Sequence, residues 1–287
     1  MGAVSGFHDR PLAPDERESL RDAFARDGAV IVPRRASPEL IARAVAAIDR
    51  IAAAGEASDR SFRADDLLPR DPAFRDLASI PAVLQLVLDL VGPTLHLAQS
   101  TLFRRPAVAA AADDYRDASP WHADGPTPNH YPVVDGVPAL LVVKVGIFLG
   151  DVPDEDAGAL RVVPGSHRRA PGTWDLSVPT PLMRVAGPPR TLAVPAGGII
   201  AFHNAVWHGA SSNRRSEPRR NVYLTYAPLW HRAVDRDQPR APDGWDAVAR
   251  VLHAGATRPE RAFFPTADEL DPFAPWRAAP VPAHGAR

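Results

Sequence analysis

The chain has 287 residues, with 33 basic against 34 acidic side chains and no cysteine. The balanced charge argues against a nucleic-acid-binding surface, and the lack of cysteine excludes disulfide frameworks, iron–sulfur clusters and thiolate metal sites. Any metal ion must therefore be held by histidine, carboxylate or backbone oxygen ligands. No apolar run reaches the roughly 18 residues of a membrane span, and no signal peptide is recognisable, so we expect a cytoplasmic protein without membrane or nucleic-acid partners. The oligomeric state stays open.

The first 92 residues are predicted to be mainly helical. Three helices are expected to begin at Pro14, Pro38 and Pro81, because proline is favoured in the first turn. Gly28 is a suitable C-cap for the first helix and Ser37 a suitable N-cap for the second. Residues 29–32 lie between these two helices and read as a short buried strand.

From about residue 93 the pattern changes to short strands separated by turns rich in proline and glycine. The expected strands are 94–103, 121–124, 139–149, 158–163, 191–194, 198–203 and 221–228. Such a series is typical of an antiparallel sandwich or jelly roll rather than a parallel sheet. We expect one domain, with N-terminal helices at 1–92, a barrel at about 93–230, and a C-terminal extension at 231–287 that holds a helix near 245–252.

A candidate metal site lies in the predicted strand 121–124. Alternate residues of a strand point to the same face, so His122 and Asp124 would present an imidazole and a carboxylate together. That pair is two thirds of the 2-His-1-carboxylate triad that binds Fe(II) in non-haem enzymes. The second histidine must come from another strand, and both His203 and His208 are available.

An arginine suited to an acidic cosubstrate follows these histidines. Arg219 stands eleven residues after His208, at the start of a predicted strand, and Arg220 is its neighbour. A planar guanidinium binds a carboxylate through two parallel hydrogen bonds. The stretch therefore offers both a metal ligand and an anchor for a dicarboxylate.

Together these segments resemble the phytanoyl-CoA dioxygenase family of Fe(II)/2-oxoglutarate-dependent oxygenases. The matching segments are 26–32, 121–124, 158–167 and 202–219, and the similarity spans about residues 10–230. The resemblance implies a mainly β fold with flanking helices, the double-stranded β-helix or cupin-like jelly roll. It also implies Fe(II) on His122, Asp124 and His208, with 2-oxoglutarate as cosubstrate, its distal carboxylate on Arg219, and O2 as the oxidant.

The family spacing also separates competing residues. Only His208 has Arg219 at the family distance, so His203 is interpreted as a core or loop histidine. Strand alternation lets one of two adjacent arginines face inward, which leaves Arg220 as a surface charge. His167 follows a Pro-Gly turn without a nucleophile elbow, so we expect it to stabilise the turn.

Lys144 is the single lysine of the chain, and it lies in the apolar run 140–149. A charged amine in such a strand is costly unless it is paired. In relatives this strand face lines the active site, so we expect Lys144 to contact a carboxylate of 2-oxoglutarate or of the substrate. The alternative is an edge lysine whose amine reaches solvent.

Two more residues are candidates for the cosubstrate. Gln99 lies on a strand that relatives use to build the pocket, with ordinary barrel filling as the alternative. Family members often have serine two residues after the distal histidine, where this chain has Ala210. Either Ser211 or Asn213 supplies the contact instead, or the contact is absent.

The substrate pocket is expected to include Thr101, Trp121, Gly146 and Tyr223. Thr101 alternates with Gln99 on its strand, and Gly146 leaves room beside Lys144. Tyr223 lies on the same inward strand face as Arg219. Packing inside the barrel is the alternative for Trp121. The loops 105–120 and 125–138, together with the tail, are expected to shape the pocket and leave the substrate unidentified.

The predicted activity is that of a dioxygenase that hydroxylates, or otherwise oxidises at a C–H bond, a small molecule with release of succinate and CO2. A specialised metabolite of a biosynthesis route is favoured over a CoA thioester, because no basic cluster is devoted to CoA. The carboxylate of Asp124 disfavours halogenation, since related halogenases carry a small residue there. A metal-binding cupin-like isomerase, which would not need Arg219, and a non-enzymatic jelly-roll binding module are the alternatives.

Overall fold

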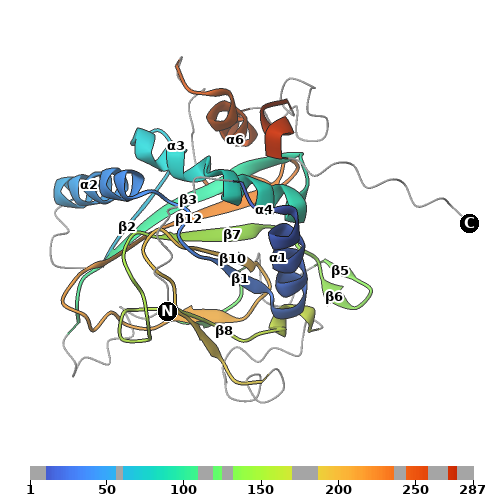
Figure 1. The fold of residues 1–287 in the computed structure, drawn as a ribbon, viewed down its shortest axis with the longest axis horizontal. Helices are drawn as coiled ribbons and strands as arrows, with labels where there is room; N and C mark the ends of the chain where they lie inside the picture. Colours follow the sequence, from blue (N-terminus) through green and yellow to red (C-terminus); the bar gives the residue numbers. More distant parts are fainter. Residues whose placement is uncertain are drawn as a thin grey trace, which may run out of the picture.

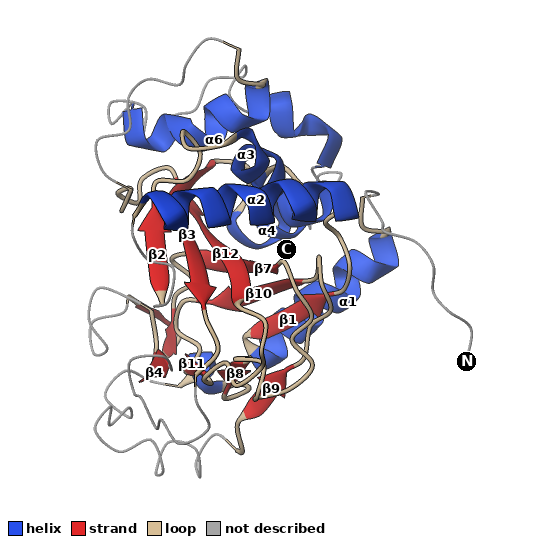
Figure 2. Cartoon of the chain, turned by 90° about the vertical axis from the view of Figure 1, so that its left-hand side faces the viewer, coloured by secondary structure: helices blue, strands red, loops and turns tan. Residues whose placement is uncertain are grey.

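The computed structural model describes residues 11–55, 61–108, 119–124, 132–169, 187–235, 244–257 and 271–276. Two antiparallel sheets face each other, and the main helices cover the outer face of the larger sheet (Figure 1). Figure 2 shows the smaller sheet on the side away from these helices. The predicted mainly β jelly roll with flanking helices is confirmed.

Most of the strands are short, and neighbours in each sheet are often far apart in the sequence. The larger sheet runs β1 (Ala29–Val32), β10 (Ile199–His203), β7 (Val143–Phe148), β12 (Arg219–Pro228), β3 (Leu95–Arg105) and β2 (Phe62–Asp65). The smaller sheet runs β4 (Ser119–His122), β11 (His208–Ala210), β8 (Leu160–Val162) and β9 (Arg190–Leu192). A separate hairpin joins β5 (Val133–Val134) to β6 (Val137–Pro138).

The strand predictions need several corrections. β2, β11 and the β5–β6 hairpin, which lies in the predicted loop 125–138, are not predicted at all. The strand expected over 139–149 begins only at Val143. The first 92 residues also supply β1 and β2 to the larger sheet. This part of the chain therefore contributes strands to the barrel as well as helices.

The helices begin and end largely where the capping signals place them. They are α1 (Pro14–Asp27), α2 (Pro38–Ala54), α3 (Pro72–Ala78), α4 (Pro81–Val91) and α6 (Ala247–Thr257), with 3-10 turns η1 (Ser166–Arg168) and η3 (Asp271–Trp276). Gly28 ends α1 with a left-handed φ of 79°, and the Ser37 side chain accepts a hydrogen bond from the Leu40 N–H. Among the α-helices of the described ranges, the short α3 is the one that is not predicted. None of the helices in the described ranges is long and apolar enough to cross a membrane.

Alternation along β12 divides the interior in two. Val222, Leu224 and Tyr226 face the helices and belong to the main core, which includes α3 and α4. The Tyr226 hydroxyl donates to the Ala78 carbonyl there. The other face of β12 looks toward the smaller sheet (Figure 2). On that face Arg219, Tyr223 and Thr225 line a cavity.

Candidate active site

Two histidines and an aspartate meet at one end of the smaller sheet. β4 and β11 pair antiparallel, which places His208 opposite His122 with 4.3 Å between their ring centroids. Oδ1 of Asp124 lies 3.7 Å from His122 Nε2, and Oδ2 lies 3.6 Å from His208 Nε2. One ligand atom from each residue falls within 4.8 Å of the others. The expected strand through Asp124 is wrong, because β4 ends at His122, but the carboxylate still reaches the cluster.

The chemistry of these groups fits a divalent metal ion. Nδ1 of His208 lies 2.9 Å from the Val206 carbonyl, so Nδ1–H donates there and Nε2 offers a lone pair toward Asp124. Burial lowers the pKa of His208 to about 4, against the opposing effect of Asp124, so its ring is neutral near pH 7. Burial favours a higher pKa for Asp124, but the neighbouring His208 and Lys144 outweigh it and hold that pKa below its usual value. A neutral imidazole and a carboxylate are groups that Fe(II) accepts as ligands.

Lys144 reaches this cluster from the larger sheet. Its Nζ lies 2.9 Å from Oδ2 of Asp124. β7 runs between β10 and β12, so the alternative of an edge lysine is wrong. The carboxylate that Lys144 contacts in the structure is that of Asp124, and contact with a bound ligand remains a prediction.

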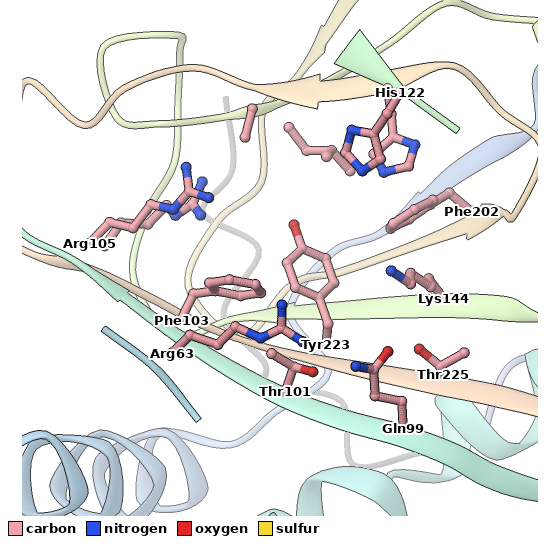
Figure 3. A pocket seen from close by; sticks show the side chains of 14 residues that line it. Arg63, Gln99, Thr101, Phe103, Arg105, His122, Lys144, Phe202, Tyr223 and Thr225 are labelled. Carbon is pink, nitrogen blue, oxygen red and sulfur yellow. The ribbon is translucent and has the colours of Figure 1, made fainter. Parts of the chain in front are cut away.

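A cavity of about 110 Å³ opens beside the cluster, between the two sheets (Figure 3). Its wall on the larger sheet comes from alternate residues of β3 and β12 together with Lys144 and Phe202. The residues that line it are Arg63, Gln99, Thr101, Phe103, Arg105, His122, Lys144, Leu160, Phe202, His208, Ala210, Arg219, Tyr223 and Thr225. The predicted Gln99, Thr101, Lys144, Arg219 and Tyr223 thus share one cavity with both histidines.

Arg219 lines the cavity at the start of β12 and is only 6% exposed. One of its terminal nitrogens donates to the carbonyl of Gly158, whose φ of +74° and missing side chain let the backbone lie against the arginine. Nε of Arg219 is buried with no hydrogen-bond partner among the described residues. Arg220 faces the other way and binds both carboxylate oxygens of Asp49 at 2.8 and 2.9 Å. Arg220 is therefore ion-paired and largely covered, where the sequence predicted a surface charge.

One predicted cosubstrate residue and two predicted pocket residues do not line the cavity. The hydroxyl of Ser211 donates to the Glu155 carbonyl at 2.7 Å, and Ala210 lines the cavity in its place. Trp121 packs against the cluster around Trp207, which favours the packing alternative. Gly146 lies behind Tyr223, and a β-carbon on it would stand 2.6 Å from Cε1 of that ring.

The rival histidines lie apart from the metal cluster. His203 accepts a hydrogen bond from the Ala205 N–H and packs 5.0 Å from the ring of His167. Burial lowers the pKa of His203 to about 3. His167 lies 3.1 Å from the Ala25 carbonyl and joins the turn to α1, as expected.

Sequence reasoning missed about half of the lining. Phe103 and Arg105 continue the alternation that points to Gln99 and Thr101, so the same period-2 pattern would have found them. Thr225 follows Tyr223 in the same way. Arg63 could not have been found in this way, because the sequence of β2 has no apolar alternation that would identify it as a strand.

The comparisons with known proteins agree with this geometry. The model of the family "Phytanoyl-CoA dioxygenase (PhyH)" matches residues 24–221. L-proline trans-4-hydroxylase of Streptomyces griseoviridis is 31% identical over 173 residues, which cover 52% of this chain and 61% of that enzyme. Ectoine dioxygenase of Bordetella bronchiseptica is 25% identical over 247 residues, which cover 75% of either protein.

Solved structures show the same fold at low identity. The ectoine enzyme EctD of S. alaskensis, with 2-oxoglutarate and 5-hydroxyectoine, is 22% identical with a TM-score of 0.61 over 86% of this chain and 90% of its own. The 2-oxoglutarate-dependent epimerase SnoN from nogalamycin biosynthesis is 24% identical with a TM-score of 0.61, over 82% and 91%. With the family model matched over most of its length, the chain belongs to the phytanoyl-CoA dioxygenase family.

Proposed function

We propose that this chain is a non-haem Fe(II)- and 2-oxoglutarate-dependent dioxygenase that oxidises a C–H bond of a small molecule. One observation carries the proposal: His122 and His208 of the metal-binding cluster line the same cavity as the buried Arg219. A metal-binding jelly roll without oxygenase chemistry would not need Arg219, whose buried Nε has no hydrogen-bond partner among the described residues. Hydroxylation, with release of succinate and CO2, is the outcome we favour.

Each part of the cofactor set has a matching group in the site. Nε2 of both His122 and His208 and Oδ1 of Asp124 would hold Fe(II), and Arg219 would hold the distal carboxylate of 2-oxoglutarate. When bound, iron and 2-oxoglutarate supply the oxidising power, since O2 is reduced as 2-oxoglutarate is decarboxylated and the substrate is oxidised.

The protein's own part is to orient groups and exclude water. The Val206 carbonyl fixes the tautomer of His208. Lys144 holds Oδ2 of Asp124, on the side of His208, and Oδ1 is directed toward His122. The backbone of Gly158 fixes the direction of Arg219. Leu160 and Phe202 supply apolar walls that keep the reacting region poor in water.

The substrate class is inferred from the relatives. The names of two of them specify L-proline and ectoine, both small metabolites, for those enzymes. We infer a small molecule, with a specialised metabolite as the favoured kind. The cytoplasmic location and the absence of nucleic-acid partners remain predictions.

Succinate formation from 2-oxoglutarate, measured with added Fe(II) under air, tests the proposal. The wild type should produce succinate even without a substrate, and Arg219→Ala should lose this turnover. Arg220→Ala is the matched control, because it removes an adjacent arginine whose partner is Asp49 on the helical side, and it should turn over like the wild type. A wild type that neither binds nor turns over 2-oxoglutarate contradicts the proposal and favours the isomerase or binding-module alternative.

A further inference from the structure

The hydroxyl of Tyr223 points into the cavity from the wall of the larger sheet. Along β12, the residues that line the cavity are Arg219, Tyr223 and Thr225, so Tyr223 carries the first hydroxyl after the arginine. In the view of Figure 3, this hydroxyl lies between the guanidinium of Arg105 and the imidazole of His122. It therefore stands between the arginine end of the cavity and the end that holds the metal-binding cluster.

The charges that act most strongly on this phenol belong to the arginine end. Burial raises the pKa of Tyr223. Among the charged groups, Arg219 opposes that rise most, Arg105 follows, and Asp124 adds to the rise by a smaller amount. The phenol thus keeps its proton near pH 7, and it is coupled more closely to Arg219 than to the carboxylate of the metal cluster.

The proton of this hydroxyl is left for an acceptor in the cavity. Asn221 lies on the same face of β12 and favours a lower pKa of Tyr223 through a side-chain hydrogen bond. Such a bond lowers the pKa of a phenol when the amide N–H donates to the phenolic oxygen. A hydroxyl that accepts from Asn221 still has its own O–H to donate, and a carboxylate oxygen is a suitable acceptor.

Tyr223 is also the neutral donor best placed beside Arg219. Apart from the two histidines, the neutral lining residues with a side-chain donor are Gln99, Thr101, Tyr223 and Thr225. The hydroxyl of Thr101 donates to Asp65 at 2.6 Å, and the amide nitrogen of Gln99 lies 3.5 Å from the same carboxylate oxygen. Thr225 lies two residues further along β12 from Arg219 than Tyr223 does. Tyr223 is thus the donor of this set that is not committed to Asp65 and is closest in strand position to Arg219.

Packing holds the Tyr223 ring in one direction. The ring is in edge contact with Phe103, Phe148 and Phe202, at 5.8, 6.4 and 6.1 Å between ring centroids. Behind it, Gly146 leaves the space that the ring occupies, since a β-carbon there would stand 2.6 Å from Cε1. A donor that is fixed before its ligand arrives loses little conformational freedom on binding, so its hydrogen bond contributes more to affinity.

We propose that the hydroxyl of Tyr223 donates a hydrogen bond to the distal carboxylate of 2-oxoglutarate, beside the guanidinium of Arg219. The inference rests on the proposed function and deepens it, because it gives the distal carboxylate a neutral donor in addition to a charged one. It also moves Tyr223 from the substrate pocket, where the sequence predicted it, to the cosubstrate. A 2-oxo acid without the distal carboxylate should gain nothing from this hydroxyl.

The test removes the hydroxyl and keeps the ring, with Tyr223→Phe. Dissociation constants of 2-oxoglutarate and of 2-oxopentanoate, which lacks the distal carboxylate, are measured by calorimetry on the Fe(II)-loaded protein without oxygen. Tyr223→Phe should weaken 2-oxoglutarate binding by about 10- to 100-fold, the scale of a hydrogen bond to a charged group, and leave 2-oxopentanoate binding unchanged.

Tyr226→Phe is the matched control, because it removes a hydroxyl from the same strand on the opposite face. The hydroxyl of Tyr226 donates to the Ala78 carbonyl on the side of the helices. This control should unfold at a lower temperature but bind both oxo acids like the wild type. Thermal unfolding checks that each variant folds, and Tyr223→Leu, which also lacks the hydroxyl, serves if Tyr223→Phe does not fold.

The outcomes separate the inference from the proposed function. Unchanged 2-oxoglutarate binding in folded Tyr223→Phe overturns the role of the hydroxyl while the proposed function stands. Equal weakening of both oxo acids also overturns it, since the effect would not involve the distal carboxylate. A wild type that binds neither oxo acid overturns the proposed function itself.

Discussion

Nζ of Lys144 lies 2.9 Å from Oδ2 of Asp124, so a central strand of the larger sheet supplies a cation to a carboxylate at the end of the smaller sheet. The contact leaves Oδ1 directed toward His122, at 3.7 Å from its Nε2. Lys144 is thus placed to orient the carboxylate and to keep it charged. In this respect it is a positioning residue for the metal site.

Lys144→Met should weaken Fe(II) binding by about 10- to 100-fold, because partners that orient a metal ligand contribute on this scale. Methionine keeps much of the length and volume of the side chain and removes its charge and its N–H donors. Metal titration without oxygen, with 2-oxoglutarate absent, measures the effect. An unchanged metal affinity combined with weaker 2-oxoglutarate binding would support the cosubstrate contact predicted from sequence, and unchanged affinities for both would eliminate both roles.

Gly146→Ala should destabilise the protein by about 1–3 kcal/mol, the usual range for overpacking an interior. The new methyl group would stand 2.6 Å from Cε1 of Tyr223, whose ring is also in edge contact with Phe103, Phe148 and Phe202. The ring cannot move away without disturbing these aromatic neighbours. Urea unfolding of the variant measures the loss.

Tyr223→Leu in the same chain is the matched rescue for Gly146→Ala. The smaller side chain frees the space that the methyl group needs, so the double variant should lose less stability than the two single losses added together. Additive losses would show that Gly146 and Tyr223 do not compete for that space.

The sequence predicts most of the metal site but for a partly wrong reason. Period-2 alternation places His122 and Asp124 on one strand face, whereas the strand ends at His122 and the aspartate reaches the cluster from beyond it. The resemblance to the family rests on the order and spacing of the matching segments, and it does not depend on where a strand ends. The same limit explains why β11 is missed: three residues, His208–Ala210, are too few for a periodic pattern.

Long-range pairings are the part that sequence does not supply. The apolar run around Lys144 predicts that the amine needs a partner, but the identity of Asp124 follows only from how the two sheets face each other. Ser211 is a comparable case, because the sequence does not show whether the side chain of residue 210 or that of residue 211 faces the cavity. The structure places Ala210 there and turns the Ser211 hydroxyl to a backbone carbonyl.

His208→Ala and His203→Ala should separate the two rival histidines. His208 lies within the cluster of ligand atoms, so its loss should reduce Fe(II) binding by at least about 10-fold and abolish succinate formation. His203 packs against His167 and lies outside that cluster, so its variant should bind Fe(II) normally and only unfold more easily. Metal content and thermal unfolding of both purified variants measure this. Normal metal binding in His208→Ala would contradict the assignment.

Asp235 should make the protein less stable as the pH rises toward neutrality. Its Oδ2 accepts hydrogen bonds from the backbone N–H and the hydroxyl of Ser100 at 2.9 and 2.7 Å, which ties the segment after β12 to β3. Burial raises the pKa of Asp235 to about 7, against the lowering effect of the Ser100 hydroxyl, and the nearby Asp66 and Asp65 add to the rise. The folded protein therefore binds this proton more tightly than the unfolded chain.

The sign of the pH effect follows from that difference. The contribution to stability is complete below about pH 4, where both states are protonated, and it is lost between about pH 4 and 7 as the unfolded chain alone releases the proton. The loss should amount to about 2–4 kcal/mol.

Asp235→Asn keeps an oxygen that accepts from Ser100 but cannot ionise, so its free energy of unfolding should fall less over this range. Asp246→Asn, which changes the aspartate that accepts from the Ala249 N–H at the start of α6, is the matched control and should retain the wild-type slope. Urea unfolding at pH 4.5, 6 and 8 makes the comparison, and a wild-type slope in Asp235→Asn would show that another group titrates.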